Sequence, residues 1–276
     1  MSLKLALGQL IVGSDKALNR QNISDTTMTA ARHGARLLVF PEASMFGFGK
    51  PNDPLDGAAE TLDGAFVSML RELSHRHNLW ILAGMFEKIE GAKHVYNTLV
   101  LTGDDGKLHG VYRKIHLYDA FGYRESNRMR AGEGDTLVFM LDGMCFGAMT
   151  CYDLRFPELA RDLVRQGAQT LLLPTAWLAG PLKEMHLATL LRARAIENTV
   201  YVGAADQCPP GYCGNSVLYD PLGVCVISLG EASGVAIGEL DPHRVAEARS
   251  KNPSLDNGRI DLYARWSERS AATPNR

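Results

Sequence analysis

Three reactive side chains follow stretches that the sequence predicts to be strands. Glu42 comes after the apolar run "RLLVF" and a proline, Lys114 ends the alternating stretch "LHGVYRK", and Cys151 follows the apolar stretch "MCFGAMT". Because open α/β sheets gather their ligands at the carboxyl ends of their strands, these side chains could meet in one site. A carboxylate, an ammonium group and a thiol can together supply a general base, an oxyanion stabiliser and a nucleophile.

Each of these side chains also has a plainer explanation when it is taken alone. Glu42 could belong to a surface turn, and Lys114 could be an edge-strand lysine that prevents aggregation. Cys151 could be a small buried hydrophobe, as free cysteines often are. That explanation fits Cys145 and Cys225 better, because both lie inside apolar strands whereas Cys151 lies at a strand exit.

The segment after Cys151 favours a chemical role for this residue. Apolar residues at helical spacing predict a helix over 154–166, with Pro157 near its start and Gly167 after its end. A cysteine at the start of a helix is close to the positive end of the helix dipole, which favours the thiolate. The unpaired backbone N–H groups of the same turn favour binding of an oxyanion.

Composition and charge exclude several classes of protein. The chain has 276 residues, of which 46% are hydrophobic and 22% charged, so a sizeable core is expected and disorder is not. The formal net charge is −2 and no basic stripe is present, which argues against a nucleic-acid partner. No apolar run approaches the roughly 18 residues that span a membrane, and "MSLKLALGQL" does not have the pattern of a signal peptide. We therefore expect a soluble, cytoplasmic protein.

The cysteines indicate neither disulfides nor a metal. They number five, which is odd, and a chain of this length needs no disulfide framework. Cys208 and Cys213, in "CPPGYC", lack the second pair or the histidine spacing of a zinc site, so a Pro/Gly loop with two incidental thiols is the simpler interpretation. The stretch "AGEGD" neither follows a strand nor opens a helix, unlike a dinucleotide-binding loop. We expect no metal and no cofactor.

The order of predicted elements repeats once along the chain. "ARLLVFPEAS" is echoed by "AQTLLLPTAW", and "LWILAGMF" is echoed by "TVYVGAAD". Helices are predicted over 15–33 and 61–77 in the first half, and over 154–166 and 182–197 in the second. The two halves therefore form one β-α-β-α-β-β unit used twice, which predicts an α/β fold, a four-layer αββα sandwich. The linker between the halves is expected at about 120–135.

Three motifs resemble the catalytic signatures of a known family. "FPE", "YRKIHL" and "CYDLRFPEL" look like those of the nitrilase, or carbon–nitrogen hydrolase, superfamily, in particular of its small Nit-type amidases. The resemblance covers nearly the whole fold and implies an αββα sandwich, in agreement with the repeat. It implies that Glu42 is the general base, Lys114 the oxyanion stabiliser and Cys151 the nucleophile. It also implies a second catalytic glutamate, which "GYRES" assigns to Glu125, with Glu133 in "AGEGD" as a nearby competitor.

Other residues are expected around this site. The backbone N–H of Tyr152 is expected to bind the oxyanion together with Lys114. Trp177 follows a predicted strand of the second half and is expected to line the pocket, although a core tryptophan is an alternative. Tyr112 lies on the same face of its strand as Lys114 and is also expected at the site.

Two arginines, Arg155 and Arg124, could bind a substrate carboxylate. Arg155 could equally pair with Glu158, three residues later on the predicted helix, and we favour that structural use. A Cys–His protease would need a histidine held against the cysteine, and no spacing supports one. His116, the nearest histidine, is expected to pack beside its strand.

The predicted activity is hydrolysis of a non-peptide C–N bond, most simply of a small linear amide to a carboxylate and ammonia through a cysteine thioester. Nitrile hydrolysis and acyl transfer to an amine are alternatives on the same residues, and a non-catalytic scaffold of the same fold is an alternative of another class. We assign residues 1–265 to a single carbon–nitrogen hydrolase domain and 266–276 to a polar tail.

The resemblance also implies a homodimer or a larger homo-oligomer. The family pairs through the helices that correspond here to 154–166 and 182–197. In this sequence both helices carry apolar residues on more than one face, among them Leu154, Leu159 and Leu163 in the first. A leftover apolar face would require a partner subunit.

Overall fold

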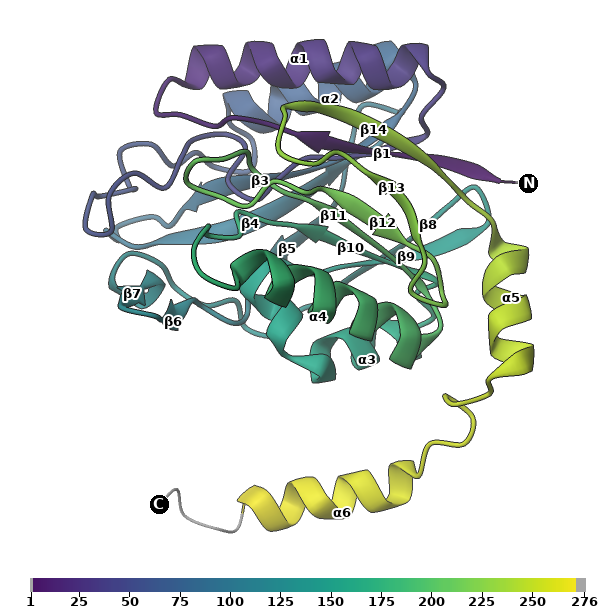
Figure 1. The fold of residues 1–276 in the computed structure, drawn as a ribbon. Helices are drawn as coiled ribbons and strands as arrows, with labels where there is room; N and C mark the ends of the chain where they lie inside the picture. The colour runs from purple at the N-terminus through teal and green to yellow at the C-terminus, as the bar shows by residue number, and fades with distance from the viewer. Residues whose placement is uncertain (1, 272–276) are drawn as a thin grey trace.

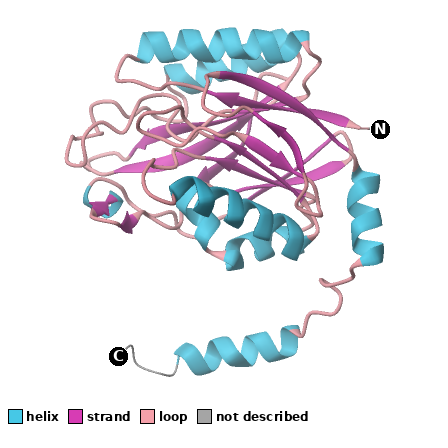
Figure 2. Ribbon diagram, in the orientation of Figure 1, coloured by secondary structure: helices cyan, strands magenta, loops and turns pink. Residues whose placement is uncertain are grey.

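Two six-stranded sheets pack face to face and carry helices on both outer faces (Figure 1, Figure 2). The structure is a computed structural model and describes residues 2–271. Helices α1 (Lys16–Arg32) and α2 (Ala65–His77) cover one sheet, and α3 (Pro157–Arg165) and α4 (Lys183–Asn198) cover the other. The predicted four-layer αββα sandwich is confirmed.

Each sheet is built mainly from one half of the chain. In spatial order, the first sheet consists of β14 (Gly234–Leu240), β1 (Leu3–Gln9), β2 (Leu37–Val39), β3 (Trp80–Lys88), β4 (Val95–Thr102) and β5 (Leu108–Arg113). The second consists of β13 (Cys225–Ser228), β12 (Val217–Tyr219), β11 (Tyr201–Ala205), β10 (Thr170–Pro174), β9 (Met144–Ala148) and β8 (Leu137–Leu141).

The two halves have the same strand order. β1, β2 and β3 are parallel neighbours, as are β9, β10 and β11, and each set continues into two antiparallel strands. This confirms the predicted repeat and adds one antiparallel strand to each unit. The remaining strand of each sheet flanks the parallel set: β14 pairs with β1, and β8 pairs with β9. Because β14 comes from the end of the chain, it ties the second half to the first sheet.

The side-chain alternation of the parallel strands creates two hydrophobic cores. In β2, Leu37 and Val39 pack between the sheets, while Leu38 packs under the helices of the first half. In β1, Leu5 belongs to the core between the sheets and Ala6 to the core under the helices. All five are fully buried. Strands buried on both faces have continuous apolar sequences, so such runs are recognisable without a structure.

In the first half, hydrogen bonds from side-chain carboxylates determine where the helices begin. The Asp15 carboxylate accepts hydrogen bonds from the first N–H groups of α1, and Gly34, with φ +75°, follows its last turn. The helix predicted over 61–77 begins only at Ala65. The reason is Glu60, whose carboxylate accepts a hydrogen bond from the Phe66 N–H at 2.7 Å and so caps the helix from outside the predicted range.

The helix predicted over 154–166 is in fact two elements. A 3-10 turn, η2 (Cys151–Arg155), is followed by α3, and Phe156 between them is extended, with φ −108° and ψ 96°. A residue that precedes a proline is disfavoured in the helical region, and Pro157 therefore divides the two elements. The other helix of this half, α4, lies within one residue of its predicted range.

The expectation of a leftover apolar face on the first of these helices is wrong. Leu154, Leu159 and Leu163 are all buried in the core of the same chain. On α4, Leu187 is buried in the same way, whereas Met185 is 53% exposed. The apolar residues after the nucleophile candidate therefore serve mainly this chain's own core.

The expected linker between the halves has structure of its own. It contains a short hairpin of β6 (Asp119–Ala120) and β7 (Tyr123–Arg124), followed by the 3-10 turn η1 (Glu125–Asn127). The hairpin lies at the same end of the molecule as the loops that follow β2 (Figure 1).

The C-terminal segment is helical beyond the last strand. β14 leads into α5 (Pro242–Lys251) and α6 (Ile260–Ala271), and α6 stands apart from the body of the protein (Figure 1). The boundary expected at residue 266 therefore lies inside a helix, and residues 272–276 of the expected tail are outside the described part. Among residues 2–271, no helix combines the length and the apolar character needed to cross a membrane.

Candidate active site

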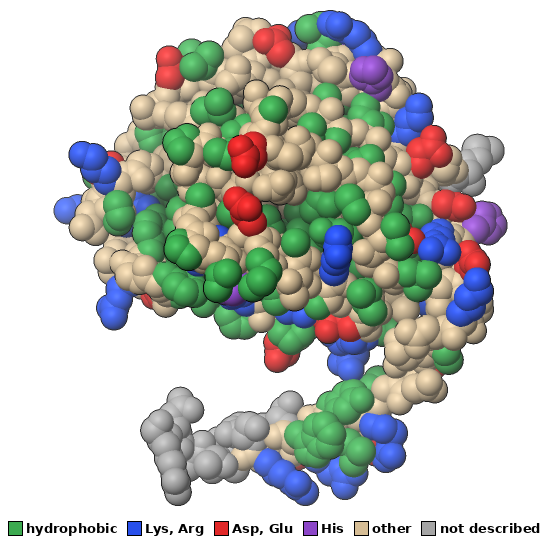
Figure 3. Space-filling model, viewed as in Figure 1, with side chains coloured by type: hydrophobic (Ala, Val, Ile, Leu, Met, Phe, Trp, Pro, Cys, Tyr) green, Lys and Arg blue, Asp and Glu red, His purple; other side chains and the backbone are tan. Residues whose placement is uncertain are grey.

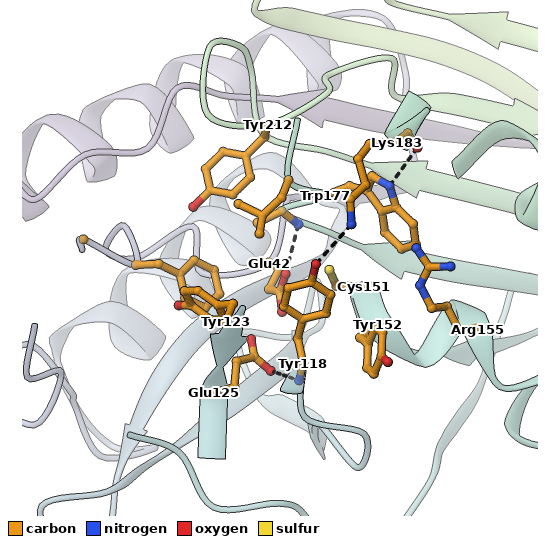
Figure 4. A pocket seen from close by; sticks show the side chains of 14 residues that line it. Glu42, Tyr118, Tyr123, Glu125, Cys151, Tyr152, Arg155, Trp177, Lys183 and Tyr212 are labelled. Carbon is orange, nitrogen blue, oxygen red and sulfur yellow. Dashed lines mark hydrogen bonds between the residues drawn. The ribbon is translucent and has the colours of Figure 1, made fainter. Parts of the chain in front are cut away.

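Four of the predicted site residues meet at one end of the sandwich. Glu42 follows β2, Lys114 follows β5, Glu125 opens η1, and Cys151 opens η2 after β9. All four are buried, and Figure 4 shows Glu42, Glu125 and Cys151 around a single pocket. The ends of strands from both sheets therefore contribute to the same site, as the sequence predicts.

Lys114 is the centre of a buried ion cluster. Its Nζ lies 2.9 Å from Glu42 Oε1 and 2.9 Å from Glu125 Oε2, and its side chain has no exposed surface. Burial alone would lower the pKa of Lys114, but the carboxylates of Glu125 and Glu42 more than offset it and raise the pKa well above its usual value. The lysine is therefore a fixed positive charge behind Glu42 and Glu125, which line the pocket.

Hydrogen bonds fix the Glu42 carboxylate in a position in which its Oε2 can still accept a proton. Oε1 accepts hydrogen bonds from Lys114 and from Asn97 Nδ2 at 2.7 Å, while Oε2 accepts one from the Ala176 N–H at 2.9 Å. A carboxylate oxygen has two lone pairs, so Oε2 can still accept a proton from a neighbour. Sequence reasoning missed Asn97, which lies inside β4 and has no distinguishing pattern. The close approach also requires Gly84, since a Cβ there would be 2.4 Å from the backbone N of the residue after Glu42.

Glu125 uses both oxygens to hold other groups. Its Oε1 accepts a hydrogen bond from Lys114 Nζ at 3.0 Å, and its Oε2, which is 2.9 Å from the same Nζ, accepts a hydrogen bond from the Tyr118 N–H at 2.7 Å. Because Tyr118 precedes the β6–β7 hairpin, Glu125 connects the hairpin to the ion cluster. The competing Glu133 is exposed and lies away from this pocket.

Cys151 occupies a strained position rather than a helix N-terminus. Its φ is +46°, a region that non-glycine residues seldom adopt and that costs on the order of 1–3 kcal/mol. The expectation that a helix dipole favours its thiolate is wrong, because η2 is a single 3-10 turn and α3 begins only at Pro157. Burial, followed by the charge of Glu42, raises the pKa of Cys151 well above its ordinary value. The resting residue is therefore a thiol that needs a base.

A pocket opens above these groups. Its walls combine aromatic side chains with a few charged ones, as expected for a small-molecule site. The lining residues are Glu42, Phe48, Gly49, Tyr118, Tyr123, Glu125, Cys151, Tyr152, Arg155, Ala176, Trp177, Leu178, Lys183 and Tyr212. Tyr118, Tyr123, Lys183 and Tyr212 were not among the predicted residues, although the aromatic content of "HLYDAFGY" is a signal for the first two.

Tyr152 and Trp177 lie in the pocket wall, whereas Tyr112 does not. Tyr112 is fully buried in the core between the sheets, and its hydroxyl donates a hydrogen bond to Asp153 at 2.6 Å. The expectation that Tyr112 lines the substrate site is corrected: it shares a strand face with the site but packs beneath it. Trp177 donates its indole N–H to the carbonyl of Lys183 at 2.9 Å, which fixes its ring.

Arg155 faces the pocket and not Glu158. Its guanidinium carbon lies 4.9 Å from the centre of the Trp177 ring (Figure 4). In the described part of the chain no ion pair joins Arg155 to Glu158. Its Nε and Nη2 atoms are buried, and no group among residues 2–271 accepts a hydrogen bond from them. The favoured structural pairing is therefore wrong, and Arg155 holds two unused donors at the pocket. The other candidate, Arg124, is exposed on β7.

Lys183 adds a second positive charge to the same wall. Its Nζ donates a hydrogen bond to the Tyr118 hydroxyl at 3.1 Å and lies 3.6 Å from the centre of the Phe121 ring. Burial, followed by the like charge of Arg155, lowers the pKa of Lys183. The described residues contain no group of three or more histidine, cysteine or acidic side chains that could hold a metal ion.

Comparisons with known proteins agree with this geometry. Residues 4–250 match the carbon–nitrogen hydrolase family. The chain is 37% identical to deaminated glutathione amidase of Escherichia coli, over 93% of this chain and 97% of that protein. It is 31% identical to an omega-amidase of Mus musculus, over 95% and 97% of the two chains. A solved structure of a mutant amidase from Nesterenkonia, in which the acetamide moiety of fluoroacetamide is attached to the active-site cysteine, superposes with a TM-score of 0.81 at 27% identity, covering 96% of this chain and 97% of that one.

We expect Glu42→Gln to slow ammonia release from a small amide by about 100-fold near pH 7, because the base that takes the thiol proton and returns it to the leaving nitrogen is removed. Alkylation of Cys151 by iodoacetamide should not fall with it, because loss of the Glu42 charge lowers the pKa of the thiol. Steady-state assays of ammonia release measure the rate. The exposed Glu133→Gln is the matched control, and equal rates for the Glu42 and Glu133 variants near pH 7 would contradict this role of Glu42.

Proposed function

The chain belongs to the carbon–nitrogen hydrolase family, and we propose that its pocket hydrolyses the amide of a small molecule that carries a carboxylate, through a thioester on Cys151. Amide C–N hydrolysis follows from the family and from its amidase relatives. The residue roles and the carboxylate are our proposal. The observation that carries it is the buried cluster of Lys114, Glu42 and Glu125 beside the thiol of Cys151.

The first half of the reaction forms the thioester. Glu42 Oε2 takes the proton of the Cys151 thiol, and the sulfur attacks the amide carbonyl carbon. The C=O electron pair moves onto oxygen and makes a tetrahedral oxyanion. As this collapses, the C–N bond breaks, and Glu42 transfers the proton to the departing nitrogen, so that ammonia leaves.

The second half returns the enzyme to its starting state. A water molecule gives one proton to Glu42 while its oxygen attacks the thioester carbon. Collapse of the second tetrahedral intermediate breaks the C–S bond. Glu42 returns the proton to the Cys151 sulfur, and the acid product leaves as its carboxylate after loss of its own proton.

Lys114 and the backbone N–H of Tyr152 are the proposed oxyanion donors. An ammonium group has three N–H donors, and two of those on Lys114 bind Glu42 and Glu125, which leaves the third for the oxyanion. Tyr152 is the second residue of the η2 turn, where backbone N–H groups have no acceptor within the turn. Loss of one such donor typically costs about 3 kcal/mol of transition-state stabilisation.

Arg155 supports a substrate that carries a carboxylate. Its two unpartnered atoms, Nε and Nη2, form the side of the guanidinium that binds a carboxylate through two parallel hydrogen bonds. Buried donors without a partner are unfavourable, and a bound carboxylate would satisfy both. Lys183, on the same wall, adds positive charge. We therefore propose a linear ω-amide of a dicarboxylic acid as the preferred substrate type.

We expect wild-type protein to release ammonia from ω-amides of dicarboxylic acids, and Cys151→Ala to release none while keeping its fold, because the residue's role is covalent. The panel includes neutral amides, carbamoyl compounds and nitriles, with hydroxylamine added to divert any acyl group. With a slow substrate, mass spectrometry should find an acyl adduct on the peptide that contains Cys151. An adduct on Cys208 or Cys213 instead, or turnover of nitriles alone, would overturn the proposal.

Arg155→Lys should lower kcat/KM for a carboxylate-bearing amide by about 10-fold to 100-fold, since a hydrogen bond to a charged group contributes about 1.5–3 kcal/mol. For a neutral amide of the same chain length the change should be small, because that substrate has no group for the guanidinium. Steady-state kinetics on the two substrates measures the difference. Arg124→Lys, on the exposed β7, is the matched control. Equal losses of kcat/KM on both substrates would show that Arg155 does not bind the substrate carboxylate.

We also propose that the protein is a homodimer or a larger homo-oligomer. The support is the apolar surface of α6, which Figure 3 shows on the projecting helix; its Ile260, Tyr263 and Trp266 are 56%, 42% and 53% exposed. Met185 of α4 is exposed as well. Apolar side chains gathered on a projecting helix favour contact with a second subunit. Light scattering should give at least twice the chain mass of 30.2 kDa. A fully active monomer would contradict this.

A cytoplasmic location is part of the same proposal. All five cysteines are free, and four of them are buried. Free thiols are typical of compartments that keep cysteines reduced.

A further inference from the structure

One buried carboxylate lies between the segment that carries Lys114 and the turn that carries Cys151. Asp153 has no exposed surface and accepts hydrogen bonds from both segments. Its Oδ2 accepts from the Thr150 N–H at 2.9 Å and from the Tyr112 hydroxyl at 2.6 Å. Its Oδ1 accepts from the N–H and the Nδ1 of His116, at 3.1 and 2.7 Å.

The donors are the close chain neighbours of the two reacting groups. Tyr112 and His116 lie two residues before and two residues after Lys114, and Thr150 directly precedes Cys151. We propose that Asp153 is a positioning residue: its single carboxylate sets the place of the Cys151 thiol relative to Lys114 and Glu42. This inference rests on the proposed function, in which the thiol and the ammonium group act on the same carbonyl.

The strained backbone of Cys151 makes such a restraint necessary. With φ at +46°, Cys151 persists in this conformation only because its surroundings hold it there. The bond from Thr150 to Asp153 closes the turn on one side. On the other side, Arg194 of α4 donates two hydrogen bonds to the Leu154 carbonyl, at 3.1 and 2.8 Å, and so fixes the end of the turn.

The donors are themselves oriented toward Asp153. A carboxylate only accepts hydrogen bonds, so Nδ1 of His116 carries a proton. The His116 ring is stacked on Phe156, with centroids 3.7 Å apart and planes 7° apart, which fixes its direction. The pKa of Tyr112 is raised by burial and by the Asp153 charge, so its hydroxyl remains a donor. The prediction that His116 packs beside its strand therefore missed its bond to the cysteine turn.

An amide of the same shape cannot replace this carboxylate. Asn has one oxygen and one NH₂ group, whereas both oxygens of Asp153 accept a backbone N–H. If the NH₂ group faces Thr150, the cysteine turn loses its restraint. If it faces His116, the lysine segment loses its restraint. In either orientation a buried backbone N–H has no acceptor, and small displacements in an active site are costly to rate.

The first test is Asp153→Asn, compared with Asp162→Asn, an exposed aspartate on α3. We expect kcat on the ω-amide to fall by about 100-fold, because the Cys151 thiol is displaced from its reactive position. The change in KM should be much smaller. The rate of Cys151 alkylation by iodoacetamide should fall as well, while the Asp162 variant matches wild type. If kcat and alkylation in Asp153→Asn, measured well below its melting temperature, stay within about twofold of wild type, the inference is overturned.

The second test keeps Asp153 in place and changes its donor. In His116→Asn the side-chain N–H can occupy the place of Nδ1, whereas in His116→Gln it corresponds to the far nitrogen of the ring; both lose the stacking on Phe156. We expect His116→Asn to retain kcat within about threefold and His116→Gln to lose about 10-fold, consistent with one lost hydrogen bond to a charged group. Equal activities in the two variants would overturn the role of this bond. This test does not depend on whether Asp153→Asn folds.

The readouts separate this inference from the proposed function. If wild type releases no ammonia from any amide of the panel, the proposed function fails, but the alkylation rates still test the positioning of Cys151. If wild type is active and the Asp153 and His116 variants behave like it in both assays, only the positioning role fails.

Discussion

A lysine ammonium group removed from water must be neutralised where it lies, and Lys114 is neutralised by two carboxylates from separate parts of the chain. Glu42 comes from the end of β2, and Glu125 comes from the segment between the halves. Removing one partner of a buried ion pair typically costs about 3–5 kcal/mol, a large part of the about 5–15 kcal/mol that stabilises a domain. The first sheet and the β6–β7 hairpin are therefore held together by the same charges that the proposed chemistry uses.

The charges of the pocket are separated along its length. Behind the floor, the Lys114 ammonium is balanced by Glu42 and Glu125, while in the wall Arg155 and Lys183 have no acidic partner among residues 2–271. A ligand with a neutral amide at one end and a carboxylate at the other complements both regions. Aromatic side chains between them restrict water, which strengthens each electrostatic contact.

The thiol depends on its neighbours for reactivity. Because burial raises the pKa of Cys151, a free thiolate is unfavourable, and in the proposed reaction the proton moves to Glu42 as the sulfur attacks. This requires accurate placement of sulfur and carboxylate, which come from different sheets. The strained turn, its hydrogen bonds to Asp153 and the bonds from Arg194 to Leu154 all restrict that placement.

The sequence alone determined the repeated α/β pattern and, through resemblance, the residues that meet at the site. Continuous apolar strands, helical periodicity and three short motifs are local signals, so the sandwich and the grouping of Glu42, Lys114, Glu125 and Cys151 were predictable. The role of Asn97 was not predictable, because nothing in the β4 sequence distinguishes this residue. Only its hydrogen bond to Glu42 in the folded protein shows that it belongs to the site.

Tertiary structure alone decided the direction and environment of the other side chains. Arg155 faces the pocket and Tyr112 packs beneath it, the reverse of their sequence interpretations, because each orientation depends on residues far away in the chain. The pKa of Cys151 likewise follows from burial and from Glu42, and not from the helix predicted beside it. Spacing along a chain specifies which residues can share a face, whereas burial and partners, which govern charge and proton transfer, exist only after distant segments have packed together.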